Sequence, residues 1–212
     1  ARAVIRDVLD ARRSWLTEPE AKAVLAAYGI PVVNTLTAAD PDGAARAAEE
    51  IGRPVALKIL SPEITHKSDL GGVRLNLLSP DAVRIAAEEM LRTISAAAPH
   101  ATILGFTVQE MASLKDPHEL ILGIAPDALF GPVLLFGQGG TAVEVVDDKA
   151  VALPPLNAVL AREMMERTRV WRLLQGYRSQ PRADIDAIAL TLIRLSQMAS
   201  DLSEVAELDI NP

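Results

Sequence analysis

The segment from Ala56 to Val73 places a lysine in an apolar run and follows it with a polar loop that ends in two glycines. Residues 55–60 carry branched and apolar side chains, interrupted only by Lys58, which is typical of a buried strand. A lysine is rarely fully buried unless an anion meets it. Gly71 and Gly72 can adopt backbone angles that other residues avoid, so the chain can turn sharply into a second strand. The segment therefore predicts two strands joined by a loop suited to phosphate chemistry.

Helical and strand patterns alternate along the rest of the chain. The apolar spacing predicts helices over 2–13, 17–28, 42–51, 81–97, 157–175 and 183–200, and strands over 31–35, 55–60, 73–77, 101–111, 119–125, 132–136 and 205–210. Residues 141–153 alternate as a hairpin does, which favours antiparallel sheet in the second half. Half of the 212 residues are apolar but only 3% are aromatic, which fits helices packed on sheets. We expect an α/β (α+β) fold with two interleaved lobes that meet near residue 110.

Composition limits the class of partner. The formal net charge of −7 and the lack of a basic stripe argue against nucleic acid, whereas a small anion needs only a local positive pocket. The chain has no cysteine, no run of 18 apolar residues and no signal-peptide pattern, so we expect a cytoplasmic protein that does not enter a membrane. It begins at Ala1 without a methionine, and we expect it to be a piece of something longer.

Four blocks, in this order, resemble the ATP-grasp domain of ADP-forming (NDP-forming) acyl-CoA synthetases, which include acetate-CoA ligases and belong to the succinyl-CoA synthetase superfamily. They are residues 16–31 (LTEPEAKAVLAAYGIP), 56–73 (ALKILSPEITHKSDLGGV), 130–144 (FGPVLLFGQGGTAVE) and 207–212 (ELDINP). The combination is more specific than any single block. The resemblance implies an ATP-grasp fold with the nucleotide cleft between its lobes.

The same resemblance implies a division of the chain. Residues 1–15 would form an N-terminal linker helix, residues 16–30 and 110–212 the larger lobe, and residues 31–109 the smaller lobe. In this family, acyl-CoA, ADP and phosphate are converted to a carboxylate, ATP and CoA through phosphohistidine. The chain would be an acid-thiol ligase of the ADP-forming type, present as a fragment or subunit.

By this resemblance His66 is the catalytic residue. It would take a phosphoryl group from a first histidine in the CoA-binding part and pass it to ADP. Neutral imidazole is nucleophilic near pH 7, so a covalent relay divides one transfer into two. Lys67 would screen the transferred phosphate and Asp69 would orient the ring. The alternative is an exposed loop histidine without a role.

The resemblance also assigns a nucleotide site for ATP or ADP. Lys58 would meet the phosphates as a point charge, unless it only extends from a strand edge into solvent. The hinge facing the adenine would consist of Val108, Gln109, Glu110, Met111 and Ala112, with Glu110 near the base or ribose. The alternative is a plain connection between strands. Glu144 would be a polar ligand of the same site.

Glycines and two oxygen-bearing side chains complete the predicted site. Backbone amides could cradle phosphate, or serve only as structural turns, at Gly71, Gly72, Gly137, Gly139 and Gly140. Asp209 and Asn211 occupy alternate strand positions and could present two oxygens to Mg²⁺. In the family the asparagine is a metal ligand, and a second ligand, an aspartate, lies on a strand beyond this chain.

The leading hypothesis is the nucleotide-binding half of such a synthetase. The sequence carries no Rossmann fingerprint for CoA, so a CoA-binding/phosphohistidine domain or subunit must supply the donor. A homo-oligomer is compatible with this. The alternatives are a non-catalytic nucleotide-sensing module of a fused protein acyltransferase and an ATP-grasp ligase that joins an acyl phosphate to an amine. His66 separates them, since neither alternative needs a phosphoryl-accepting histidine.

Overall fold

The computed structural model describes residues 1–64, 67–112, 117–140, 148–176 and 181–210. Three predicted site residues, His66, Glu144 and Asn211, lie outside these ranges. The chain divides into two compact units: unit 1 holds Ala1–Ala27 and Pro31–Ser113, and unit 2 holds Tyr28–Ile30 and Leu114–Pro212. This division groups residues 16–27 with unit 1. The predicted lobes are defined by a nucleotide cleft, and their boundaries stay a prediction.

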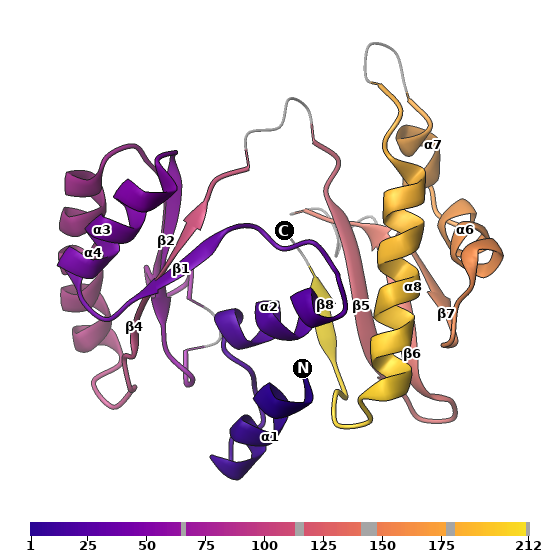
Figure 1. The fold of residues 1–212 in the computed structure, drawn as a ribbon, viewed down its shortest axis with the longest axis horizontal. Coiled ribbons are helices and arrows are strands. Elements are labelled where there is room, and N and C mark those ends of the chain that lie inside the picture. Colours follow the sequence, from indigo (N-terminus) through magenta and orange to yellow (C-terminus); the bar gives the residue numbers. More distant parts are fainter. Residues whose placement is uncertain (65–66, 113–116, 141–147, 177–180, 211–212) are drawn as a thin grey trace. The chain divides into compact units, whose positions relative to one another are not determined.

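Unit 1 is built on a four-stranded antiparallel sheet. Its strands follow the order β1-β4-β2-β3, with bounds β1 (Thr35–Ala38), β2 (Val55–Leu60), β3 (Val73–Leu77) and β4 (Gly105–Glu110). Helices α3 (Pro41–Ile51) and α4 (Pro80–Ala97) cover one face of this sheet (Figure 1). The sheet side chains that point away from α3 and α4 lie on its opposite face.

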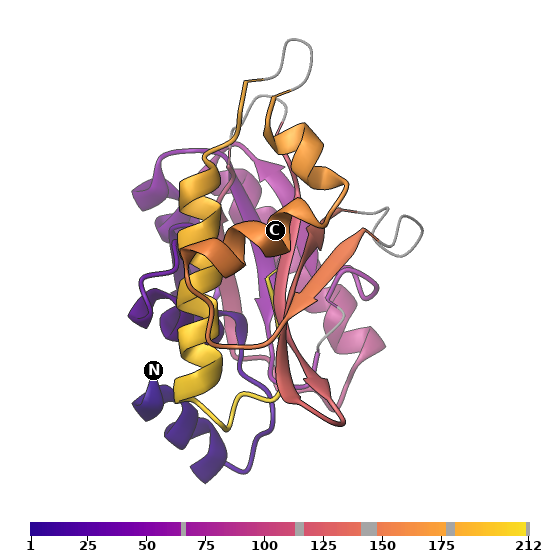
Figure 2. The same cartoon turned by 90° about the vertical axis from the view of Figure 1, so that its right-hand side faces the viewer.

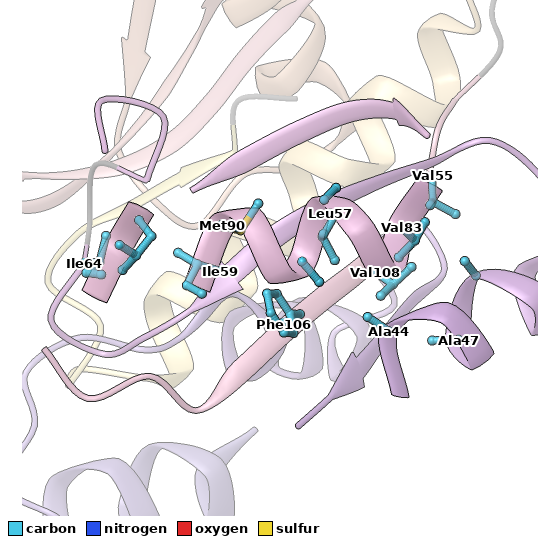
Figure 3. Packing of buried hydrophobic residues seen from close by; sticks show 14 residues of the cluster. Ala44, Ala47, Val55, Leu57, Ile59, Ile64, Val83, Met90, Phe106 and Val108 are labelled. Carbon is cyan, nitrogen blue, oxygen red and sulfur yellow. The ribbon is translucent and has the colours of Figure 1, made fainter. Parts of the chain in front are cut away.

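Helices α3 and α4 begin where the sequence provides a capping side chain followed by proline. Asp40 accepts the N–H of Gly43 at 2.6 Å, and Ser79 accepts that of Ala82 at 3.2 Å. Figure 3 shows the core that results between sheet and helices, which includes Leu57, Ile59, Met90, Phe106 and Val108. Because strand side chains alternate between faces, the residues between these core positions point to the other side of the sheet.

Two helices precede the sheet, α1 (Arg2–Asp10) and α2 (Glu18–Ala27). The start of α2 is fixed by Glu20, whose Oε2 accepts the Thr17 N–H at 2.7 Å and the Thr17 hydroxyl at 2.8 Å. This contact is one half of a capping box. Arg13 adds an ion pair to Glu20 at 2.6 Å. Glu20 therefore secures the helix, while Glu18, two residues earlier, makes different contacts.

Unit 2 contains a second four-stranded antiparallel sheet of order β7-β6-β5-β8. Its strands are β5 (Leu120–Asp127), β6 (Gly131–Gln138), β7 (Lys149–Ala152) and β8 (Leu208–Ile210). Helices α6 (Ala158–Glu166) and α8 (Ile185–Asp201) pack on this sheet, and α7 (Val170–Leu174) follows α6 (Figure 2). None of the helices in the described ranges is both long and apolar enough to cross a bilayer.

Most predicted elements are present, although the strands predicted over 101–111 and 205–210 begin only at Gly105 and Leu208. Three further predictions differ from the structure. The strand predicted over 31–35 is wrong, because the pairing with β4 starts only at Thr35. The helix predicted over 157–175 is two helices, since the chain breaks between Glu166 and Val170. Of the predicted hairpin over 141–153, the described part forms β7 and pairs with β6, while residues 141–147 lie outside the described ranges. The mixed α/β class with antiparallel sheets is confirmed.

Candidate functional site

The sheet register in unit 1 brings polar side chains together on the face opposite α3 and α4. Lys58 of β2 is paired with Thr107 of β4, and Gln109 of β4 is paired with Thr35 of β1. These positions alternate with buried core residues on β2 and β4. Long side chains at diagonal positions of neighbouring strands can reach one another. The register therefore allows Lys58 and Gln109 to share a contact.

Glu18 of α2 lies among three ammonium groups. Its Oε1 is 2.9 Å from Nζ of Lys58 and 3.0 Å from Nζ of Lys22, and its Oε2 is 3.4 Å from Nζ of Lys67. No side chain of the four is more than 25% exposed. Three ammoniums and one carboxylate leave two net positive charges, in a chain whose formal net charge is −7. We call these four residues the lysine cluster.

The ionisation of Glu18 depends on its neighbours. Burial opposes the charged form, but hydrogen bonds and charges from Lys58 and Lys22 outweigh it and lower the pKa of Glu18 to about 2. Burial also lowers the pKa of Lys22, as do the charges of Lys58 and Lys67, whereas Glu18 opposes this change. The carboxylate is therefore the group that makes it favourable to hold several ammoniums close together.

Gln109 provides the second shared acceptor. Its side-chain Oε1 accepts a hydrogen bond from Lys22 Nζ at 2.9 Å and one from Lys58 Nζ at 3.1 Å. Lys22 also donates to the hydroxyl of Thr35 at 2.7 Å. The side chain of Gln109, which was predicted in the adenine hinge, thus lies with the lysines.

The end of the predicted phosphate loop is held in a closed turn. Gly72 donates its N–H to the Lys67 carbonyl at 2.7 Å, and Gly71 donates to Ser68 at 3.1 Å. A Cβ on Gly72 would lie 2.8 Å from Cγ2 of Ile59, and Gly71 has a φ of +71°. Close packing and a left-handed backbone thus require these glycines. The same turn brings Lys67, the neighbour of His66, to Glu18.

The predicted hinge has fewer free backbone donors than expected. The N–H of Glu110 donates to Asn34 at 3.0 Å and that of Met111 to Pro54 at 2.9 Å. The side chain of Val108 is buried in the core, and the Glu110 carboxylate pairs with Arg53 at 2.6 Å. The N–H groups of Glu110 and Met111 therefore already have acceptors. A backbone contact between the hinge and adenine stays a prediction, and it would use carbonyl oxygens or Ala112.

The predicted glycine loop of unit 2 is partly strand. Gly137 lies within β6, opposite Lys149. The N–H of Gln138 donates to Asp148 at 3.0 Å, and that of Gly139 donates to Glu119 at 2.8 Å. These amides are occupied, and the close approach of neighbouring strands accounts for the glycines. A phosphate contact of Gly137, Gly139 or Gly140, the last with a φ of +88°, stays a prediction.

The predicted metal site is described in part. Asp209 lies in β8 opposite Gly123, and partial desolvation together with the charge of Glu207 raises its pKa. A carboxylate whose charge is opposed in this way suits a bound cation. Within the described ranges, no group of three His, Cys, Asp or Glu side chains is arranged to hold a metal ion. Mg²⁺ binding at Asp209 and Asn211 therefore stays a prediction.

Sequence reasoning missed three members of this arrangement, namely Glu18, Lys22 and Thr35. Glu18 and Lys22 are four residues apart on a helix, which is the spacing of an ordinary surface ion pair. Their one distinguishing signal was their position inside the block of residues 16–31, which resembles the family. No feature of the sequence marked Thr35 as a site residue, because it was predicted as the last residue of a strand.

The comparisons with known proteins cover nearly the whole chain. The profile of a family described as an ATP-grasp domain matches residues 7–212. The β subunit of acetate-CoA ligase (ADP-forming) II from Pyrococcus furiosus is 39% identical over 99% of this chain, which spans 88% of that subunit. Acetate-CoA ligase (ADP-forming) I from Archaeoglobus fulgidus is 42% identical over 91% of this chain, but the match covers only 28% of that ligase.

Solved structures of similar fold match the whole chain. The dinucleotide-forming acetyl-coenzyme A synthetase 1 of Candidatus Korarchaeum cryptofilum, in complex with coenzyme A and Ca-AMPCP, superposes with a TM-score of 0.94 at 39% identity. The match covers all of this chain and 91% of that one. A second structure of that enzyme, with Mg-AMPPCP and its phosphohistidine segment pointing towards the nucleotide binding site, gives a TM-score of 0.86 at 37% identity.

Proposed function

The chain belongs to the ATP-grasp family, and we propose that it is the nucleotide-binding part of an ADP-forming acyl-CoA synthetase. The predicted ATP-grasp fold is confirmed by the family profile and by the superposed structures. In the proposed reaction, acyl-CoA, ADP and phosphate become a carboxylate, ATP and CoA. Curated relatives that are named ADP-forming acetate-CoA ligases support this assignment over a ligase that uses an amine.

The lysine cluster is the observation on which the proposal rests. Lys58, Lys22 and Lys67 surround one carboxylate, and the two remaining positive charges attract an anion such as a nucleotide phosphate. An ammonium at a strand position provides a compact charge with rotatable donors. Lys58 would hold the phosphates of ADP and lower the repulsion that an incoming phosphoryl group meets.

His66 would carry the phosphoryl group. The phosphorus–nitrogen bond of a donor phosphohistidine would break as a new one forms at the imidazole of His66. That second bond would then break as a terminal phosphate oxygen of ADP attacks, which gives ATP and the free imidazole. The position of Lys67, the next residue, in the lysine cluster supports this role, because it links the His66 loop to the phosphate-binding charges.

A partner must supply the donor. The chain matches a protein named as a β subunit across 88% of its length, which supports a separate partner that carries the CoA-binding and phosphohistidine functions. The 28% coverage of the Archaeoglobus ligase is compatible with the same parts on one longer chain. A homo-oligomeric assembly and a cytoplasmic location stay predictions.

Mg²⁺ is the proposed metal, since a Korarchaeum structure is described with Mg-AMPPCP. When bound, it would neutralise phosphate charge. Asp209 and Asn211 would hold it, and the raised pKa of Asp209 fits a carboxylate that gains from a nearby cation. The lysines of unit 1 would bind phosphate oxygens independently of these two residues.

Isothermal titration with ADP and transfer of labelled phosphate test this function. We expect the chain to bind ADP, and we expect acid-labile label on His66 when a CoA-binding partner, acyl-CoA and labelled phosphate are added. Absence of ADP binding with and without Mg²⁺ would contradict the nucleotide site. If His66→Ala binds ADP and still exchanges the phosphoryl group fully, the relay is contradicted. If the wild type binds ADP but does not exchange the phosphoryl group, a sensing module is favoured.

A further inference from the structure

The side chain of Gln109 makes contacts that its predicted hinge position does not explain. Its Oε1 lies 3.1 Å from Nζ of Lys58 and 2.9 Å from Nζ of Lys22. We propose that Gln109 is a positioning residue for Lys58, and that it acts on the phosphates of the nucleotide through that lysine. This inference rests on the proposed nucleotide-binding function and deepens it.

Three hydrogen bonds and one ion pair close a ring between two ammoniums and two acceptor oxygens. Lys58 donates to Oε1 of Glu18 and to Oε1 of Gln109, and Lys22 donates to the same Gln109 oxygen and forms an ion pair with the same Glu18 oxygen. A carboxylate or amide oxygen has two lone pairs, so each of these oxygens is fully used by the two ammoniums. Neither ammonium can swing away without breaking two of these contacts. The ring therefore fixes the place of both lysines before any ligand binds.

The two lysines differ in what they have left to offer. An ammonium has three N–H donors. Lys22 faces three acceptors within 3.0 Å: it donates hydrogen bonds to Gln109 and to the hydroxyl of Thr35, and it forms an ion pair with Glu18. Among the residues that the structure describes, Lys58 has two acceptors, which leaves one donor for a ligand. Lys58 is thus the member of the ring that can donate to a phosphate without losing a contact, and Lys22 supports it.

The chemistry of an amide suits this positioning role. Only the oxygen of Gln109 can accept from two ammoniums, because its NH₂ group would direct hydrogens against them. The side chain is neutral, so it orients Lys58 without cancelling the charge that attracts phosphate. A carboxylate at this position would orient the lysines equally well but would remove one of the two net positive charges of the cluster.

A double-mutant cycle with ADP binding as the measurement tests the proposal. Gln109→Met keeps the length of the side chain and removes its acceptor. We expect it to weaken ADP binding about tenfold, which corresponds to one hydrogen bond to a charged group. In a Lys58→Met background, the same change should have no further effect, because the lysine through which Gln109 acts is gone. Gln197→Met, on the exposed part of α8 where Gln197 donates to Asp201, is the matched control and should leave ADP binding unchanged.

The outcomes separate this inference from the function on which it rests. If the wild type does not bind ADP, the proposed function is wrong. If the wild type binds ADP but Gln109→Met has no effect, or has the same effect with and without Lys58, then Gln109 does not act through Lys58. An equal effect in both backgrounds is also the result expected if Gln109 touches the base directly. Thermal melting of each variant without ligand shows whether a loss of binding reflects a loss of folded protein.

Discussion

Lys58 donates a hydrogen bond to Glu18 at 2.9 Å, although 40 residues separate them in the sequence. This contact ties the first turn of α2 to the middle of β2. Without it, burial would favour a neutral carboxyl group, and the ammoniums would repel one another. The contact therefore assembles, inside unit 1 and without a ligand, the positive charge that we propose binds phosphate.

Lys58→Met should weaken ADP binding by about tenfold to a hundredfold, because it removes the donor of a charge-assisted hydrogen bond. Isothermal titration at constant ionic strength measures this change. Arg84→Met is the control, since Arg84 lies on the surface of α4 and, among the described residues, pairs with Asp81 and Glu88. An equal loss of affinity in both variants would point to the overall charge of the protein rather than to a site at Lys58.

Replacing Glu18 with glutamine should change how stability depends on pH. The pKa of Glu18 is about 2 in the folded protein and about 4.5 when unperturbed, so its stabilising effect is present above pH ~4.5 and is lost as the pH falls toward 2. The free energies of unfolding of the wild type and Glu18→Gln should differ most near neutral pH. Urea denaturation at several pH values measures this difference, and a difference that stays constant down to pH 3 would contradict the assignment.

The lysine cluster shows what sequence could and could not predict. Lys58 was found because a lysine in a buried strand pattern is unusual, and the glycines were found because of their backbone properties. Glu18 and Gln109 were not recognised as its partners, because their contacts depend on the register between β2 and β4 and on the packing of α2. No local pattern encodes these distances, so only the folded chain brings the four side chains together.

The start of β1 shows a similar limit for the fold. Val32 and Val33 are branched and apolar, which favours a strand, yet they are 40% and 38% exposed. The strand instead begins at Thr35, where pairing with Gln109 becomes available. Pairing partners, which are distant in sequence, overrode the local preference. Strands flanked by clear turn signals, such as residues 73–77, were predicted with the observed bounds.

Gly72→Ala should destabilise unit 1 more than the neighbouring change Gly71→Ala. A Cβ on Gly72 would lie 2.8 Å from Ile59 and 2.9 Å from the Lys67 carbonyl, which requires the turn or the core to shift at a cost of about 2 kcal/mol. Gly71 has open space, with no atom closer than 3.8 Å, so its cost is the strain of a positive φ, about 1 kcal/mol. Chemical denaturation of both variants gives the order, and the reverse order would mean that backbone strain dominates.

Asp148→Ala should be strongly destabilising in unit 2. The buried carboxylate accepts the N–H groups of Arg169 at 2.6 Å and Val170 at 2.7 Å, where α7 begins. Its removal leaves two backbone donors without their charged acceptor, and we expect a loss of about 3 kcal/mol. Asp186→Ala is the control, because its side chain is 91% exposed in an ion pair with Arg162 and should contribute about 1 kcal/mol or less. Comparable losses measured by urea denaturation would show that the two backbone contacts of Asp148 add little.

Thr107→Val should stabilise the protein. The hydroxyl of Thr107 is buried, and within the described part of the chain it has no hydrogen-bond partner, although it lies beside Lys58 in the sheet register. A buried hydroxyl without a partner carries a desolvation cost, and valine has the same shape without that cost. We expect the free energy of unfolding to rise by about 1 kcal/mol, with ADP affinity unchanged, because Lys58 already has Glu18 and Gln109 as acceptors. A fall in stability would mean that the hydroxyl is hydrogen-bonded in the folded protein, and a fall in ADP affinity alone would place Thr107 among the groups that contact the nucleotide.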